Sequence, residues 1–149
     1  DLIADIPYIK GIIFEDFPWW SRVMLKKPRT TILPLPLYYY IPNFGGIVLS
    51  AKQLRIINSL CTGIADAFGA YKESATEYQM KKWSENFQWY FINWAFRKIK
   101  YIQSEDEKAA AQECFRELER IGALDKPPFK WAKKLRAQIC NFIKTCRVE

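Results

Sequence analysis

The sequence contains no histidine, so Ser-His and Cys-His nucleophilic machinery and histidine metal sites are excluded. It has no glycine loop that could cradle a phosphate, because Gly45-Gly46 is followed by neither Lys-Ser/Thr nor a G-x-G-x-x-G spacing. It also lacks an Asp-x-Asp triplet that could hold a divalent ion on a nucleotide diphosphate. We therefore expect neither a metal site nor a nucleotide site among these residues.

Cysteines are few, and long apolar runs are missing. The cysteines are Cys61, Cys114, Cys140 and Cys146. None forms a C-x-x-C pair, so we expect free thiols in a reducing compartment. No apolar run reaches the roughly 18 residues that a membrane-spanning helix needs. The chain opens without an initiator Met or a signal-peptide pattern. We expect a cytoplasmic protein and a piece of a longer polypeptide.

The residues that are abundant are apolar and basic. Half of the 149 residues are hydrophobic and 16% are aromatic, which excludes a disordered tail. The formal net charge is +7, which favours anionic partners such as anionic lipid or a phosphorylated substrate. The basic residues match no recognised nucleic-acid-reading motif, so we expect no specific binding of nucleic acid.

Residues 1–47 differ in pattern from the remainder. We expect a strand over 8–14, a helix over 16–27, an edge strand over 30–40 and a turn over 42–46. Pro28 should end the helix, since proline cannot continue one. Strands this isolated would present open edges, which favour pairing with a sheet elsewhere in the polypeptide or with a second copy of the chain.

Residues 48–149 are helical in pattern, with apolar residues recurring at steps of three and four. We expect helices from an N-cap at Ser50 through Phe68, over 75–103, over 105–121 with Ser104 as cap and Gly122 as stop, and from about Pro128 onward. The inward residues of the second and last helices should be Met80, Trp83, Phe87, Tyr90 and Trp94, then Trp131, Leu135, Ile139, Phe142 and Cys146. The fold class predicted is mainly α, with a small β element.

The segment from Gly11 to Trp20 concentrates residue types that carry chemistry. The apolar run Gly-Ile-Ile-Phe leads into Glu15 and Asp16, and Trp19 and Trp20 follow. A strand that ends on carboxylates can place a catalytic acid or base. The same pair can instead cap the following helix, since acidic groups satisfy free N–H groups there and favour the helix dipole.

Residues 9–47 resemble the C-terminal part of the catalytic domain of family 2 glycosyltransferases, bacterial enzymes that build capsule, lipopolysaccharide and related surface glycans. The resemblance is carried by the Glu-Asp string, by Leu-Pro-Leu-Tyr-Tyr-Tyr at 35–40 and by Gly-Gly-Ile at 45–47. Ile41 and Gly46 stand where the family often has Arg and Ser.

The resemblance implies a GT-A fold, in which residues 1–47 end the acceptor side of the catalytic domain and residues 48–149 form a helical extension. The nucleotide-sugar donor and a divalent Mg²⁺ or Mn²⁺ would bind an upstream part, so this chain alone would be inactive. Asp16 would be the general base of an inverting transfer to a glycan acceptor, a role that contributes about 10²–10⁴-fold. Glu15, Trp19 and Trp20 would contact that acceptor.

The last helix carries a second candidate surface, made of Lys130, Trp131, Lys133, Lys134 and Arg136. A basic helix with aromatic residues can lie on an anionic membrane, which would suit a lipid-linked acceptor at the inner membrane face. The alternative without a binding role is a solvated basic face on a helix whose apolar side packs on the domain. The competing function is a non-enzymatic helical module that binds a partner protein or an anionic membrane surface, in which Glu15 and Asp16 only cap.

Overall fold

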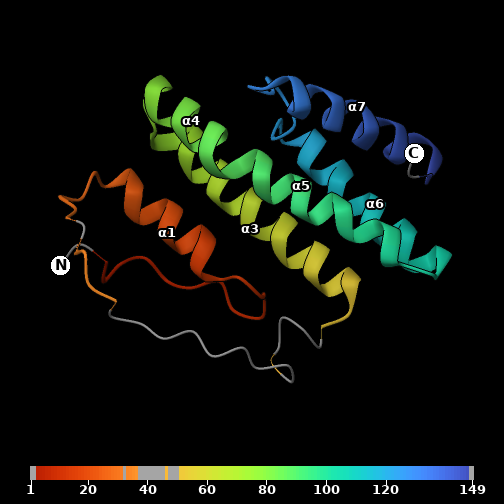
Figure 1. Ribbon diagram of the computed structural model, residues 1–149, viewed down its shortest axis with the longest axis horizontal. Helices are drawn as coiled ribbons and strands as arrows, with labels where there is room; N and C mark the ends of the chain where they lie inside the picture. The colour runs from red at the N-terminus through yellow and green to blue at the C-terminus, as the bar shows by residue number, and fades with distance from the viewer. Residues whose placement is uncertain (1–2, 32, 37–45, 47–50, 148–149) are drawn as a thin grey trace.

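The computed structural model describes residues 3–31, 33–36, 46 and 51–147, and this part of the chain is mainly α-helical, as the sequence predicts (Figure 1). The α-helices are α1 (Asp16–Leu25), α3 (Gln53–Ser74), α4 (Glu77–Trp83), α5 (Trp89–Lys98), α6 (Glu105–Arg120) and α7 (Lys130–Thr145). A π-helical turn, η1 (Ser84–Gln88), joins α4 to α5, and a 3-10 turn, η2 (Ile99–Tyr101), follows α5.

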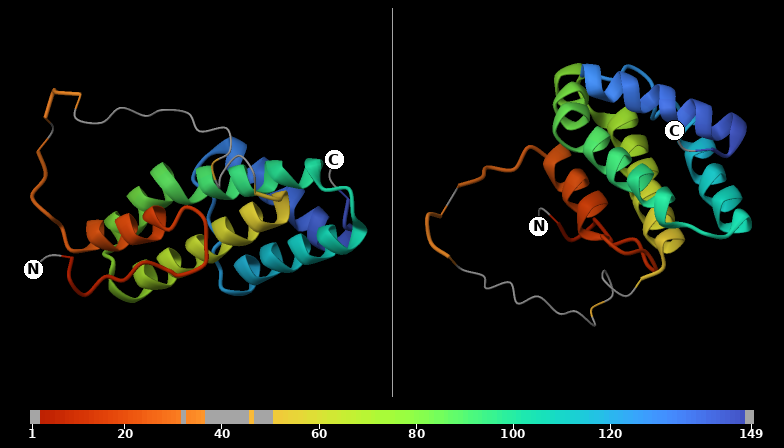
Figure 2. Two further views of the ribbon diagram at one scale, coloured as in Figure 1. Left: turned by 90° about the horizontal axis from the view of Figure 1, so that it is seen from below. Right: turned by 45° about the vertical axis from the view of Figure 1, so that its right-hand side comes forward.

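Helix α3 lies at the centre of the bundle, with α1, α5 and α6 packed around it. Helix α7 packs on α5 and α6, so α1 and α7 lie on opposite sides of the molecule (Figure 2). The apolar stripe predicted for α3 is confirmed, because Ile57, Cys61 and Ile64 are buried. Burial of this stripe against three neighbours explains why a helix of 22 residues forms here.

Three phenylalanines join α5, α6 and α7. The rings of Phe96, Phe115 and Phe142 meet edge to face, with centroid separations of 5.7, 6.0 and 6.2 Å. This is the arrangement that aromatic quadrupoles favour, and all three side chains are buried. The cluster makes this side of the bundle a tightly packed core.

Helix α1 is fixed on α3 and α4 by close packing and polar bonds. Gly63 lies under Pro18, where a Cβ atom would come within 3.4 Å of the proline Cδ. The Arg22 guanidinium binds both carboxylate oxygens of Asp66, with an Nε–Oδ2 distance of 2.9 Å. The Trp83 indole also donates to the Ser21 hydroxyl at 3.1 Å. Helix α1 therefore gives the residues before it a rigid base.

The small β element is not found among the described residues. The strand predicted over 8–14 is wrong here, because Gly11 and Phe14 have φ angles of +85° and +65° that interrupt an extended backbone. The Ile13 N–H donates to the Ser59 hydroxyl at 3.0 Å, so α3 provides the partner that a neighbouring strand would have offered. The described part of 30–40 contains no strand either, and its remainder and the predicted turn, apart from Gly46, lie outside the described residues.

Most helix ends agree with the predictions to within a few residues, although α3 continues past Phe68 to Ser74. Helix α1 ends just before Lys27, whose φ is +51°, and α6 ends before Gly122, whose φ is +84°. Ser104 accepts a hydrogen bond from the Glu107 N–H at 3.4 Å, as expected of a cap. The prediction of an N-cap at Ser50 needs correction, because Lys52 occupies that position of α3 and Ser50 lies outside the described residues.

The long helix over residues 77–101 buries a different face from the one predicted. Trp83 is buried as expected, but Phe87, Tyr90 and Trp94 are 38%, 54% and 36% exposed. From the last residue of the π turn onward, the buried residues are Gln88, Trp89, Ile92, Ala95, Phe96 and Ile99. A π turn contains about one residue more than an α turn, so it moves the buried face one position along the sequence. The predicted aromatic stripe is consequently turned outward.

Candidate functional site

An open groove of about 480 Å³ lies between α1, the segment before it, and the helix formed by η1 and α5. It is lined by Tyr8, Phe14, Asp16, Phe17, Trp19, Trp20, Phe87, Phe91 and Trp94. We call it the aromatic groove, because Asp16 is its one lining residue that is not aromatic. The structure thus brings together Asp16, Trp19 and Trp20, three of the residues singled out in the sequence.

The two walls of the aromatic groove come from segments far apart in the sequence. The Phe17 and Phe91 rings lie 3.8 Å apart, and the Phe14 and Trp94 rings lie 4.7 Å apart, measured between centroids. The second wall exists because the π turn directs Phe87, Phe91 and Trp94 toward α1 rather than into the core. Aromatic residues that a regular α-helix would have buried therefore line an open surface.

Trp19 and Trp20 are held differently. The Trp19 ring stacks on Tyr8, with centroids 5.2 Å apart and planes 14° apart, and its indole N–H donates to the Ile6 carbonyl at 3.0 Å. Trp20 lies 6.4 Å from Trp19 and is 44% exposed. Trp19 is therefore anchored to the N-terminal segment, whereas Trp20 offers more of its surface to a ligand.

Asp16 is the first residue of α1, and its side chain is exposed in the aromatic groove. Glu15 occupies the N-cap position and makes no side-chain cap bond. Within the described residues, the Asp16 carboxylate takes part in no hydrogen bond or ion pair. Its position suits the positive end of the α1 dipole, but its oxygens stay available to a ligand.

The backbone just before the two carboxylates is strained. Phe14 has a φ of +65°, a conformation that a bulky residue rarely adopts and that costs about 1–3 kcal/mol. It is held by the contact of its ring with Trp94 and by the neighbouring Ile13–Ser59 hydrogen bond. This sharp turn ends the N-terminal segment and places Asp16 at the edge of the aromatic groove.

Glu15 lies apart from its neighbour. It is exposed and lines a separate shallow hollow of about 380 Å³, shared with Tyr8, Ile9, Lys10, Gly11 and Ile12. It is not among the residues that line the aromatic groove. The two adjacent carboxylates therefore open onto different surfaces, and Asp16 alone shares a surface with Trp19 and Trp20.

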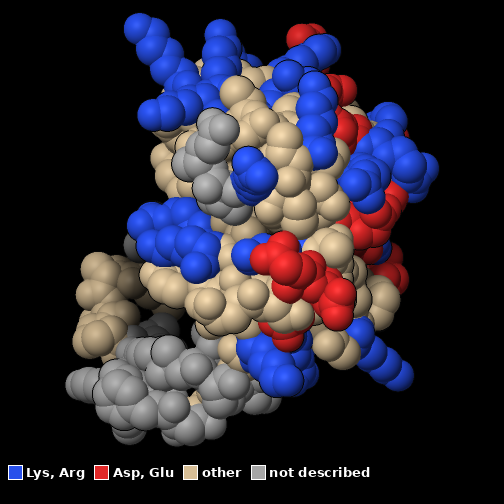
Figure 3. Space-filling view, turned by 90° about the vertical axis from the view of Figure 1, so that its right-hand side faces the viewer, with Lys and Arg blue, Asp and Glu red and all other residues tan. Residues whose placement is uncertain are grey.

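The basic surface predicted for the last helix is present in part. Lys130, Lys133 and Lys134 are exposed on α7. Figure 3 looks at one end of the bundle and shows Lys and Arg gathered along its top, on the side where α7 lies in Figure 1. Arg136 is half-buried instead, because its Nε donates to the Leu124 carbonyl at 2.9 Å. It ties α7 to the preceding loop.

The sequence predicted that Trp131 points inward, but this is wrong, because its side chain is 38% exposed. Ala132 is buried in its place, one position along the helix. The Trp131 ring stacks on Phe129 with a centroid separation of 5.7 Å and contacts Tyr90, which the π turn has directed outward, at 5.3 Å. Aromatic contact on the surface therefore holds Trp131 beside the lysines of α7.

The described residues contain no group of three or more His, Cys, Asp or Glu side chains that could hold a metal ion. The cysteines are free thiols. Burial raises the pKa of the Cys61 thiol well above its ordinary value, so little thiolate is present to act as a nucleophile or ligand. Burial also raises the pKa of Cys114.

Sequence reasoning missed one wall of the aromatic groove. It placed Phe87 and Trp94 in the core and gave no site role to Phe91 or Tyr8. No sequence pattern marks a π turn, so the outward rotation was not visible. A usable signal was the excess of aromatic residues in this helix, because one buried face cannot hold Trp83, Phe87, Tyr90, Phe91 and Trp94 together.

No family model, curated protein or solved structure matches this chain. None of the helices in the described part is both long enough and apolar enough to span a lipid bilayer.

Proposed function

We propose that this chain is the acceptor side of an inverting GT-A glycosyltransferase. The full polypeptide would transfer a sugar from a nucleotide-sugar donor to a glycan or lipid-linked acceptor in bacterial surface polysaccharide synthesis, at the inner face of the membrane. The observation that carries the proposal is the Asp16 carboxylate, which lies unbonded at the edge of a groove lined otherwise by aromatic side chains.

The chemistry of the aromatic groove suits a sugar. Ligand sites are mostly apolar concavities of about 300–1,000 Å³ with a few placed polar groups, and the aromatic groove, at about 480 Å³, falls in this range. Aromatic rings offer apolar faces to the C–H face of a sugar ring, and Trp20 and Trp94 are the exposed tryptophans here. The carboxylate supplies a hydrogen-bond acceptor for a hydroxyl group.

In this proposal Asp16 accepts the proton of the acceptor hydroxyl while that oxygen attacks the anomeric carbon of the donor sugar. Trp19 and Trp20 orient the acceptor ring, and Glu15 contacts the acceptor on the side of its separate hollow. The donor and its Mg²⁺ or Mn²⁺ bind the upstream part of the polypeptide. When bound there, that ion would supply positive charge to the diphosphate leaving group.

The test is sugar transfer by the whole polypeptide that contains this chain. Asp16→Asn should lower kcat about 10²–10⁴-fold, because the amide cannot take the proton, while donor binding stays unchanged. Asp106→Asn is the matched control. Asp106 is also exposed in the first turn of a helix, α6, and does not line the aromatic groove. The control should leave kcat unchanged.

The two variants also separate catalysis from a purely structural role. Each removes one acid from a first helical turn, so each should lower the free energy of unfolding by about 0.3–1 kcal/mol. Equal losses of stability together with equal, near-normal turnover would assign Asp16 to the helix dipole and refute the proposal. An upstream region without a nucleotide-sugar domain would also refute it.

The exposed lysines and Trp131 on α7 favour a second candidate function, that of a basic helical module which binds an anionic membrane surface. Flotation with vesicles containing anionic lipid tests it. Association of the wild type should decrease as the salt concentration rises, and the variant K130Q/K133Q/K134Q should lose this association. The control K52Q/R55Q/K72Q removes as many charges from exposed positions at the N-cap of α3 and within α3, and it should keep the association. If both variants lost association equally, the binding would depend on net charge alone and the α7 surface would have no specific role.

A further inference from the structure

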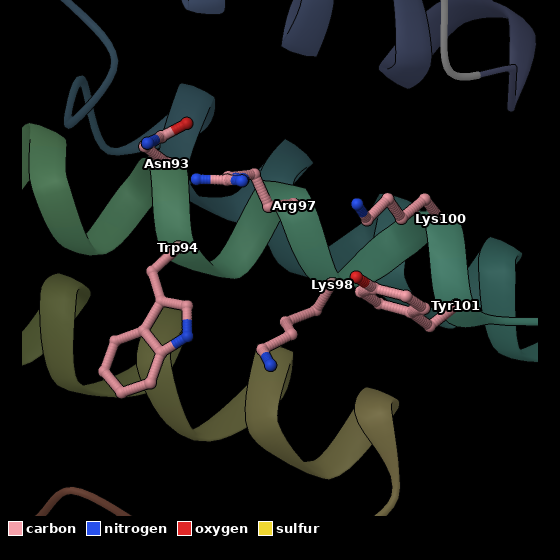
Figure 4. A pocket seen from close by; sticks show the side chains of 6 residues that line it. All are labelled: Asn93, Trp94, Arg97, Lys98, Lys100 and Tyr101. Atoms are coloured by element: carbon pink, nitrogen blue, oxygen red, sulfur yellow. The ribbon is translucent and has the colours of Figure 1, made fainter.

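A second hollow, of about 310 Å³, adjoins the aromatic groove at the end of α5. It is lined by Asn93, Trp94, Arg97, Lys98, Lys100 and Tyr101 (Figure 4). We call it the basic hollow. Trp94 lines both the basic hollow and the aromatic groove, so one indole forms part of the wall of each.

The cations of the basic hollow have no acidic partner in the described part of the chain. Arg97 and Lys100 are exposed, Lys98 is half-buried, and none of the three takes part in an ion pair there. On α6, by contrast, Arg116 and Arg120 each bind a glutamate three residues away. The basic hollow therefore keeps a concentrated positive charge that an anionic ligand could neutralise.

The side chains that line the basic hollow come from one stretch of chain, the second half of α5 and η2. Figure 4 shows Trp94 and Lys98 extending to the same side of α5, while Arg97 lies beside Asn93 and Lys100 lies near Tyr101. The Lys100 ammonium is 4.7 Å from the centroid of the Tyr101 ring. Asn93 adds an amide, so the lining offers hydrogen-bond donors as well as charge.

Tyr101 reports on the electrostatics of the basic hollow. A hydrogen bond from Lys100, together with its charge, lowers the pKa of the Tyr101 phenol below its ordinary value. The charges of Lys98 and Arg97 lower it further. The groups that stabilise a phenolate oxygen here would stabilise another anionic oxygen in the same place.

We propose that the basic hollow binds an anionic group, a phosphate or a carboxylate, carried by the acceptor whose sugar ring lies in the aromatic groove. This inference rests on the proposed function and adds to it the chemical class of the acceptor. Because Trp94 lines both surfaces and Lys98 extends to the same side of α5, a sugar ring against the Trp94 indole places a substituent next to Lys98. The lysines of α7 line neither surface, so a variant that removes them serves as the control in the test below.

The test measures binding to this 149-residue chain by the ¹H–¹⁵N resonances of the tryptophan indoles, assigned with Trp94→Phe and Trp20→Phe. The probes are the methyl glycosides of glucose, galactose, mannose and N-acetylglucosamine, the 6-phosphates and uronic acids of hexoses, and inorganic phosphate. We expect an anionic sugar to shift Trp94 and Trp20 and to bind roughly tenfold more tightly than its neutral counterpart.

Two variants assign the charge. R97Q/K98Q/K100Q should weaken binding of the anionic sugar roughly tenfold and leave binding of the neutral sugar unchanged. Raising the ionic strength should have the same effect on the wild type. K130Q/K133Q/K134Q removes the same number of charges from α7 and should change neither the affinity for the anionic sugar nor the affinity for the neutral sugar. A preference for the 6-phosphate over the uronic acid identifies the anion as phosphate, and the reverse preference identifies it as carboxylate.

The outcomes separate this inference from the proposed function. Neutral sugars that shift Trp20 and Trp94, with no gain from a phosphate or carboxylate, would overturn the basic hollow and leave the glycosyltransferase proposal standing. Inorganic phosphate that binds as tightly as every sugar phosphate would also overturn it, since the two surfaces would then not act on one ligand. If no sugar shifts either indole, both proposals fail.

Discussion

Single residues in this protein are held in conformations that their neighbours enforce. Phe14 keeps a left-handed backbone because its ring contacts Trp94 and because the adjacent Ile13 N–H is bonded to Ser59. Strain of this kind persists only where the surroundings fix it, and it gathers at functional sites. Asp16, two positions further on, takes its location from this turn.

The two glycines Gly11 and Gly69 should respond to alanine with opposite signs. At both positions a Cβ atom would find no other atom within 4 Å, so packing does not decide the outcome. Gly11 has a φ of +85°, where alanine is strained, and Gly11→Ala should destabilise by about 1–2 kcal/mol. Gly69 lies within α3, where alanine is the better helix former, and Gly69→Ala should stabilise by up to about 1 kcal/mol.

Urea denaturation followed by circular dichroism measures both changes. A destabilising Gly69→Ala would show that this part of α3 has no room for a methyl group. A neutral Gly11→Ala would show that the N-terminal segment adopts another backbone conformation, and the placement of Asp16 would then lose its support.

Two tryptophans should separate binding from stability. Trp20 is 44% exposed and lines the aromatic groove, so Trp20→Ala should lower sugar affinity roughly two- to tenfold and unfolding stability by less than about 1 kcal/mol. Trp83 is 2% exposed, stacks on Tyr71 at 4.8 Å and donates to Ser21. Trp83→Ala should cost about 3–5 kcal/mol.

Denaturation curves and indole NMR titrations of both variants check this prediction. Trp20→Phe should retain most of the sugar affinity, because an aromatic face remains. A large loss of stability in Trp20→Ala would mean that Trp20 is part of the core, and it would remove this indole from the proposed acceptor site.

At the scale of elements, the π turn decides what the aromatic residues of the long helix do. One additional residue between Trp83 and Ile92 puts Gln88, Trp89 and Ile92 into the core and turns Phe87 and Trp94 out. Gln88 is accepted in the core because its side-chain amide donates to the Ala123 carbonyl at 2.6 Å. The aromatic groove is therefore a consequence of helix register.

Deleting Asn86 tests this account of the register. Asn86 is exposed within the π turn, and its side chain donates to the Lys82 carbonyl at 2.8 Å. Without it a regular α-helix would run from Trp83 to Ile92 with the same residues buried, so unfolding stability should change by no more than about 1 kcal/mol. Inserting an alanine after Asn86 is the control.

The insertion would rotate Ile92, Phe96 and Ile99 out of the core, and each such loss is worth about 2–5 kcal/mol. Urea denaturation of both variants, with the wild type, measures the difference. If the deletion destabilised as much as the insertion, the π turn would be required by the core itself and would not be an added residue.

The helices themselves could be predicted because their signals are local. Helix ends were predicted at Ser104, Gly122 and Pro28 from backbone preferences that act within a few residues. All three predictions are confirmed. The strand over 8–14 could not be judged in this way, since a strand depends on a partner. Here Ser59 of α3 bonds to the Ile13 N–H.

The candidate site could be predicted on one side only. Asp16, Trp19 and Trp20 are close in sequence, so any fold that starts a helix at Asp16 keeps them together. Their neighbours in space, Phe91 and Trp94, are brought there by the packing of α1 beside α5 and by the π turn. Neither is encoded by a local pattern, which is why that wall was assigned to the core.

At the scale of the whole molecule, the aromatic groove depends on how the bundle is assembled. Its walls belong to residues 8–20 and 87–94, and α3 supports both α1 and α5 from behind. The phenylalanine cluster on the far side of α5 locks α6 and α7 onto the same bundle. We expect these helices to unfold as one cooperative unit, since they share a continuous core.

The buried thiol of Cys61 on α3 provides a test of this cooperativity. Burial raises its pKa well above the ordinary value, so at neutral pH it stays protonated and reaches its reactive thiolate only at higher pH or after unfolding. Iodoacetamide should therefore label Cys61 in proportion to the equilibrium fraction of globally opened molecules, whereas the half-buried Cys146 past the end of α7 reacts in the native protein. Peptide mapping by mass spectrometry measures both rates.

Phe142→Ala, on α7, should then accelerate the labelling of Cys61 by at least about a hundredfold, because removing a fully buried phenylalanine costs about 3–5 kcal/mol of global stability. Tyr78→Ala, at a side chain that is 69% exposed, should leave the rate unchanged. An unchanged rate in Phe142→Ala would mean that α3 opens independently of α7. In that case the aromatic groove would be supported by α1, α3 and α5 alone, and the rest of the bundle would have no influence on its geometry.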